Sequence, residues 1–143
     1  MPRGASPPEL ATVEVKDNIY VIRSGASGNV TVLVSDDGVL LIDDKFANDH
    51  DGVMAQLAKI TMQPVRYVIN THLHQDHTGG NAQMQALGAE LIASANARRI
   101  MMVRMMNRAK RSRDDIQAML KTEFGWSDFM MNFGLDGIIA EMQ

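Results

Sequence analysis

Three of the chain's four histidines and an aspartate fall within six positions of the segment NTHLHQDHTGG, residues 70–80. Imidazole nitrogens and carboxylate oxygens are the usual protein ligands of Zn²⁺, Fe and Mn ions. In extended backbone, His72 and His74 project to the same side and can hold one ion. Asp76 and His77 follow directly and can face a second ion across a tight loop. The segment therefore predicts a metal site rather than a polar loop of ordinary hydrogen-bonded histidines.

A metal site of this kind can activate water. Metal-bound water loses a proton near neutral pH, and a second ion lets the pair hold both nucleophile and leaving group. Asp76 can act as a ligand and can also orient or deprotonate that water, which makes it the candidate catalytic residue. No serine stands in the context of a nucleophile elbow, and no phosphate-binding glycine loop is present. The expected nucleophile is therefore a metal-bound hydroxide.

The rest of the chain must supply the elements that position this segment. Alternating apolar residues predict strands within residues 13–21 and 30–34, and apolar runs predict strands at 39–43, 65–70 and 89–94. Helical spacing predicts helices at 48–61 and 79–88. From Ser94 onward the pattern is helical, with helices expected at 96–111, from Asp114 to Gly125, and around 135–142. This order predicts an α/β or α+β fold in which a mixed sheet carries helices on one face.

The stretch THLHQDHTGGN resembles the H-x-H-x-D-H signature of the metallo-β-lactamase fold superfamily, and the resemblance extends over roughly residues 12–100. It implies an αββα sandwich and hydrolysis of lactams, thioesters, esters or phosphodiesters, usually with Zn²⁺ and sometimes with Fe or Mn. By resemblance, the first metal takes His72 and His74 as ligands, and the second takes Asp76 and His77.

Asp43, at the end of LLIDD, matches by resemblance an aspartate that braces the site from behind the ligands. Other ligands that the family draws from its second half are missing, because no histidine follows His77. The resemblance thus implies a shortened member: half of the sandwich, followed by C-terminal helices. One metal with open positions for water is one expectation. Completion of the shell by His50, Asp44 or a carboxylate of a partner chain is the other.

Residues 1–9 are rich in Pro, Gly and Ser and are expected to form a disordered arm. Residues 10–143 are expected to form a single compact domain, with the sheet and metal loop in 10–95 and a helical tail in 96–143. Half of a sandwich leaves a large apolar face uncovered, which monomers rarely tolerate. A homo-oligomer, most simply a twofold dimer, is therefore expected; tail helices folded back over the sheet are the alternative.

Three functions compete at this stage. The leading hypothesis is a metal-dependent hydrolase that acts on small ester, phosphoester or lactam substrates. The second is a non-catalytic metal-binding or oligomerising remnant of the same fold. The third is a nucleic-acid binder that uses the basic residues 91–113, with the histidine loop as a metal-dependent nuclease. That segment holds seven of the 14 Lys and Arg and no acid. This hypothesis ranks last because aromatic residues make up only 5% of the chain and none lies in that segment.

Composition limits the remaining classes. The absence of cysteine excludes disulfides and thiolate metal ligands. No apolar run is long enough to span a bilayer, so no membrane association is expected. The first residues, MPRGASPPE, lack the apolar core of a signal peptide, which leaves cytoplasm and periplasm both open.

Overall fold

The computed structural model describes residues 9–24 and 27–140, and the chain divides into two compact units, Met1–Ala93 and Ser94–Gln143. The expected disordered arm at residues 1–9 lies, except for Glu9, outside the described residues. The expectation that residues 10–143 form one compact domain stays a prediction. Among the described residues, no helix is both long and apolar enough to cross a lipid bilayer.

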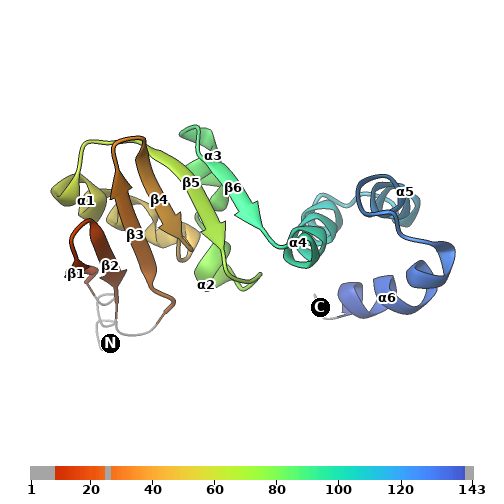
Figure 1. The fold of residues 1–143 in the computed structure, drawn as a ribbon. Coiled ribbons are helices and arrows are strands. Elements are labelled where there is room, and N and C mark those ends of the chain that lie inside the picture. The colour runs from red at the N-terminus through yellow and green to blue at the C-terminus, as the bar shows by residue number, and fades with distance from the viewer. Residues whose placement is uncertain (1–8, 25–26, 141–143) are drawn as a thin grey trace, which may run out of the picture. The chain divides into compact units, whose positions relative to one another are not determined.

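The first unit contains one six-stranded sheet whose strands follow each other in space as in the sequence (Figure 1). The strands are β1 (Ala11–Lys16), β2 (Ile19–Arg23), β3 (Val30–Ser35), β4 (Gly38–Ile42), β5 (Val65–Asn70) and β6 (Glu90–Ala93). Strands β1 to β4 pair antiparallel, whereas β4, β5 and β6 pair parallel. The predicted mixed sheet is therefore confirmed.

The two parallel connections carry the helices, because parallel neighbours need a crossover. A 3₁₀ turn η1 (Ala47–Asp49) and helix α1 (His50–Ile60) link β4 to β5, and α2 (Gln75–Thr78) and α3 (Asn81–Ala86) link β5 to β6. Apolar residues of α1 and α3 pack on one face of the sheet, as predicted. The buried core contains Ile22, Val30, Val32, Leu41, Val53, Leu57, Val68 and Met84.

The opposite face of the sheet is also apolar. One row of cross-strand partners runs through all six strands and contains no charged residue: Val13, Val21, Thr31, Ile42, Ile69 and Ile92. The neighbouring row is apolar between two charged ends: Lys16, Ile19, Leu33, Leu40, Tyr67 and Glu90. Its Leu33 and Tyr67 are 40% and 43% exposed. We call these two rows the open face of the sheet.

The second unit consists of three helices: α4 (Ala95–Arg108), α5 (Arg113–Phe124) and α6 (Asp128–Ala140). Their apolar sides form a separate core that contains Val103, Ile116, Leu120, Trp126, Met131 and Leu135. Ser112 and Asp115 form a capping box at the start of α5, and Gly125 ends that helix with a left-handed backbone, as predicted.

Candidate metal centre

The histidine segment lies on the connection between β5 and α3. Asn70, the buried last residue of β5, exchanges two side-chain hydrogen bonds with Asn81, the first residue of α3, over 2.8 and 3.1 Å. This amide pair holds the two ends of the segment together. Between them the chain makes a short loop and then α2, a single helical turn that the sequence did not predict.

Asp43, at the end of β4, holds this loop from the neighbouring strand. One oxygen of its carboxylate accepts from the backbone N–H of Thr71 at 2.8 Å. The other oxygen accepts from the Thr71 hydroxyl and from Nδ1 of His77, each at 2.7 Å. Because a carboxylate can only accept, Nδ1 of His77 donates to Asp43, and in the neutral ring Nε2 holds the lone pair. Asp43 thus fixes the tautomer of His77 that can bind a metal.

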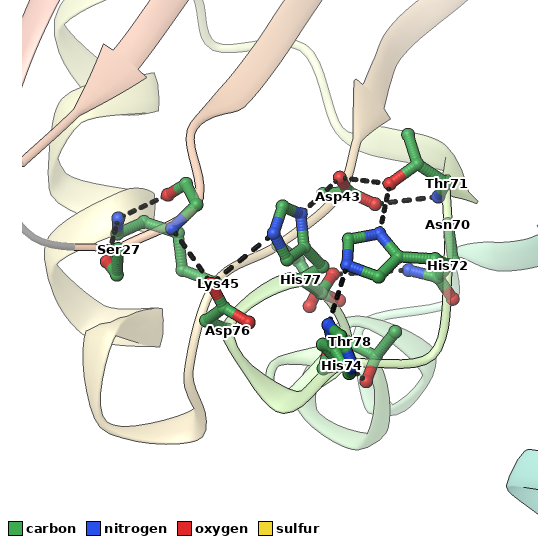
Figure 2. A network of polar contacts seen from close by, with 12 residues as sticks. Ser27, Asp43, Lys45, Asn70, Thr71, His72, His74, Asp76, His77 and Thr78 are labelled. Carbon is green, nitrogen blue, oxygen red and sulfur yellow. Dashed lines mark hydrogen bonds and ion pairs between the residues drawn. The ribbon is translucent and has the colours of Figure 1, made fainter.

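Thr71 determines which ring nitrogen of His72 carries the hydrogen, as Asp43 does for His77. The hydroxyl hydrogen of Thr71 is committed to Asp43, so its oxygen is left to accept from Nδ1 of His72 at 2.9 Å. Nε2 of His72 therefore also keeps a lone pair. It lies 3.1 Å from Nδ1 of His74. Figure 2 shows this chain of contacts running from Asp43 through Thr71 and His72 to His74.

Asp76 and His77 form a second donor pair. Nε2 of His77, the nitrogen left free by Asp43, lies 3.3 Å from Oδ2 of Asp76. Two donors that bind one Zn²⁺ tetrahedrally at about 2.0–2.1 Å lie about 3.3 Å apart. Both the His72–His74 pair and the Asp76–His77 pair have separations near this value. The donor set therefore fits a divalent ion at either pair.

Grouping ligand atoms by distance alone gives a different set of possible metal ligands. Asp43, His72 and His77 each offer a ligand atom within 4.8 Å of the others, which makes them a possible metal cluster. However, both oxygens of Asp43 already accept hydrogen bonds from Thr71 and His77. A bracing role therefore fits Asp43 better than a ligand role. The five residues singled out in the sequence lie together in the structure, and their individual roles stay predictions.

The two residues considered for completing the shell are Asp44 and His50. Asp44 directs Oδ1 to the backbone N–H of Gly80 at 2.9 Å, and its Oδ2 is buried without a hydrogen-bond partner. Burial, with the negative charge of Asp43 adding to it, raises the pKa of Asp44 to about 7, although the Gly80 hydrogen bond lowers it. His50 begins α1.

Two further residues of the site were not foreseen. Lys45 is fully buried, and its amine donates to Ser24 Oγ, Ser27 Oγ and the Gly28 carbonyl at 3.1, 2.6 and 2.5 Å. Burial lowers the pKa of this amine, and the charges of Asp49 and Asp76 raise it. The backbone N–H of Gly28 in turn donates to Oδ2 of Asp76 at 3.3 Å.

The only sequence signal for these contacts is the placement of three charged residues, Asp43, Asp44 and Lys45, directly after an apolar strand. Backbone hydrogen bonds tie this triplet to the metal loop: Asp44 N–H donates to the His77 carbonyl, and Gly79 N–H donates to the Lys45 carbonyl. The triplet is thus part of the site's frame.

Comparison with known proteins places this site in context. The chain is 46% identical over 50 residues to a hydroxyacylglutathione hydrolase of Polaromonas sp., a match that covers 34% of this chain and 19% of that protein. It is 34% identical over 59 residues to a coenzyme F420H(2) oxidase of Methanothermobacter marburgensis, covering 38% of this chain and 15% of that protein. The matches thus span less than a fifth of these relatives, whose named activities differ.

The structure is similar to that of BJP-1, a subclass B3 metallo-beta-lactamase of Bradyrhizobium japonicum. The TM-score is 0.52 at 29% identity, and the similarity covers 60% of this chain and 33% of that chain. The sequence profile of the Metallo-beta-lactamase superfamily matches residues 23–99, which include the sheet from the end of β2 and the whole histidine loop. The chain therefore belongs to the metallo-beta-lactamase superfamily.

Proposed function

We propose that this protein is a metal-dependent hydrolase that acts on a small ester, phosphoester or lactam. The observation that carries the proposal is the arrangement of two donor pairs, His72 with His74 and Asp76 with His77, at separations suited to a metal ion. Membership of the superfamily and the fixed tautomers of His72 and His77 support it. The expected metal is Zn²⁺, one or two ions, with Fe or Mn as alternatives.

Five side chains and Thr71 would have distinct roles in this reaction. His72 and His74 would hold one ion, and Asp76 and His77 a second one. A bound ion would supply Lewis acidity and would lower the pKa of a water molecule. Asp76, which is partly exposed, would orient that water and accept its proton. Asp43 and Thr71 would keep both imidazoles in the metal-binding tautomer.

The first test is the zinc content per chain, measured by elemental analysis on purified protein, together with hydrolysis of a nitrophenyl ester, a bis-nitrophenyl phosphodiester and a chromogenic β-lactam. We expect bound zinc and turnover of at least one substrate. Asp76→Ala with His77→Ala should lose zinc, and Asp76→Asn should lower kcat by about 10²–10⁴. His50→Ala, which changes the one histidine outside the segment, is the matched control and should keep both properties.

The same experiment distinguishes the hydrolase from the second hypothesis, a non-catalytic metal-binding or oligomerising protein. Stoichiometric zinc without turnover of any of the three substrates would favour a metal-binding scaffold over an enzyme. A folded protein that binds no zinc, iron or manganese, in wild type and double variant alike, would refute the metal centre itself and favour a structural or oligomerising role.

We also propose that the protein is a homodimer in which a second copy covers the open face of the sheet. Sheets stack face to face about 10 Å apart through interlocking apolar side chains. The open face offers an uncharged row across six strands, with Leu33, Tyr67 and Ile92 each at least 40% exposed. A twofold contact presents this same surface from both copies, so one apolar face is enough to build it.

A further inference from the structure

Lys45 is the least expected member of the core around the site. It is 0% exposed, and lysine is almost never fully buried unless it has partners. An ammonium group has three hydrogens to donate, and Lys45 has three acceptors: Ser24 Oγ, Ser27 Oγ and the Gly28 carbonyl. Each donor thus has one partner, so the burial cost of the amine is offset by a complete set of hydrogen bonds.

Filling space alone would not require a lysine here. A methionine has a similar length and would fill the same space without a charge to desolvate. Lys45 also has a left-handed backbone, with φ of 63°, which costs a residue other than glycine roughly 1–2 kcal/mol. At Lys45 the chain therefore keeps both a buried charge and a left-handed backbone, each of which costs folding free energy. The hydrogen bonds described for its side chain go to the connection between β2 and β3.

That connection meets the metal centre at Gly28. The carbonyl of Gly28 accepts from Lys45, while its N–H donates to Oδ2 of Asp76. The approach is so close that a Cβ on Gly28 would lie 2.7 Å from the Asp76 carbonyl oxygen and 2.7 Å from Cε1 of His77. Figure 2 shows Lys45 and Ser27 lying on the side of Asp76 and His77 that faces away from His72.

We propose that Lys45 is a positioning residue of the metal centre: its buried amine clamps Gly28, which in turn holds the Asp76 carboxylate against His77. The inference rests on the proposed metal function. It assigns to Lys45 the placement of the Asp76 carboxylate in the Asp76–His77 pair, whereas Asp43 orients the His77 ring and Thr71 orients His72. Loss of the clamp should therefore weaken one donor pair and spare the other.

The first test is the zinc affinity of Lys45→Met, measured by competition with a chelating dye. Outer partners of metal ligands typically contribute 10- to 100-fold to metal affinity, so we expect the weakest bound zinc to lose affinity by this factor. The melting temperature of the metal-free variant is measured alongside, so that weaker zinc binding by a folded variant is distinguished from unfolding. Lys59→Met, at an exposed position of helix α1, is the matched control and should bind zinc like wild type. Affinity within twofold of wild type in Lys45→Met would overturn the proposal.

The second test needs no metal. In metal-free protein, the Gly28 amide should exchange its hydrogen at least about tenfold faster in Lys45→Met than in wild type, because the peptide is no longer held toward Asp76. The Gly80 amide, bonded to Asp44, is the internal control and should be unchanged. If wild type binds no zinc, the proposed function fails, but this readout still decides the clamp. Equal Gly28 exchange in both proteins would refute it.

A variant that keeps Lys45 covers the case in which Lys45→Met does not fold. Ser24→Ala with Ser27→Ala removes two of the three acceptors and leaves the lysine in place. Faster exchange at Gly28 with weaker zinc binding would support the clamp. Wild-type values of both would contradict it.

Discussion

Three consecutive residues after β4 each fix a different part of the candidate site. Asp43 accepts from Thr71 and His77, Asp44 accepts from the Gly80 amide, and Lys45 donates to Gly28 and two serines. Because φ is 63° at both Asp43 and Lys45, successive side chains leave the backbone in different directions. A triplet of adjacent residues can therefore reach both sides of the metal loop.

Asp44 gives a pH-dependent prediction at this scale. Its pKa rises from 3.8 to about 7 on folding, so the folded state binds the proton more tightly than the unfolded state. The stability from this group is fully present below pH 4 and is lost as pH rises through 7. In metal-free protein the difference corresponds to about 4 kcal/mol at most, since one pKa unit is about 1.4 kcal/mol.

Asp44→Asn keeps an oxygen for the Gly80 N–H but cannot ionise. The free energy of unfolding, from urea titrations of metal-free protein at pH 4 to 8, should match wild type at pH 4 and exceed it at pH 8. Asp51→Asn, at the first turn of α1, is the control and should follow the wild-type curve. A variant curve parallel to that of wild type would show that Asp44 ionises at its ordinary pH.

At the scale of elements, most of the fold could be predicted because hydrophobic periodicity is a local property. Alternating residues around Val32 and the apolar run before Asp43 were enough to predict strands β3 and β4. Helix α2 could not be predicted in this way, because four residues, Gln75–Thr78, are too few to show a period.

In the candidate site, residues close together in the sequence could be predicted, whereas residues brought together only by the fold could not. His72, His74, Asp76 and His77 are near neighbours in the sequence, so their chemistry could be recognised there, and Asp43 was suggested by family resemblance. Lys45 and Gly28 could not be predicted, since their roles depend on tertiary contacts. Gly28 meets Asp76 across 48 positions of sequence, a distance that no local pattern encodes.

The capping box of α5 gives a prediction about an element. Ser112 accepts from the Asp115 N–H at 3.1 Å, and Asp115 accepts from the Ser112 N–H at 3.3 Å. Ser112→Ala should lower the unfolding free energy of the second unit by about 1 kcal/mol, measured by hydrogen exchange at α5 amides. Asp114→Asn, in the same turn but outside the box, should cost less; equal losses would argue against a specific cap.

At the scale of the whole molecule, the two units have separate cores, one around the sheet and one among α4, α5 and α6. Among the described residues, the metal loop and its side-chain hydrogen-bond partners belong to the first unit. Zinc binding is therefore expected to act on the stability of the sheet unit. The open face of that unit is the surface that a second copy is proposed to cover.

The proposed dimer predicts a mass of twice 15.8 kDa by light scattering after gel filtration. Leu33→Glu places a charge in the middle of the open face and should give a monomer, because an unpaired charge is costly to bury. Met62→Glu is the control, since Met62 is 93% exposed outside the sheet, and it should leave the mass unchanged. A monomeric wild type would contradict the dimer.

Because the backbone is left-handed at Asp43 and Lys45, selection for folding and selection for metal binding favour different residues at these positions. Glycine adopts this conformation at no steric cost, so glycine at either position relieves the backbone while removing a side chain that frames the site. A mutant library sorted for soluble yield would tolerate glycine there, and the same library sorted for retained zinc would reject it. If glycine is enriched at positions 43 and 45 in the first sort and depleted in the second, Asp43 and Lys45 are retained for the metal site and not for folding.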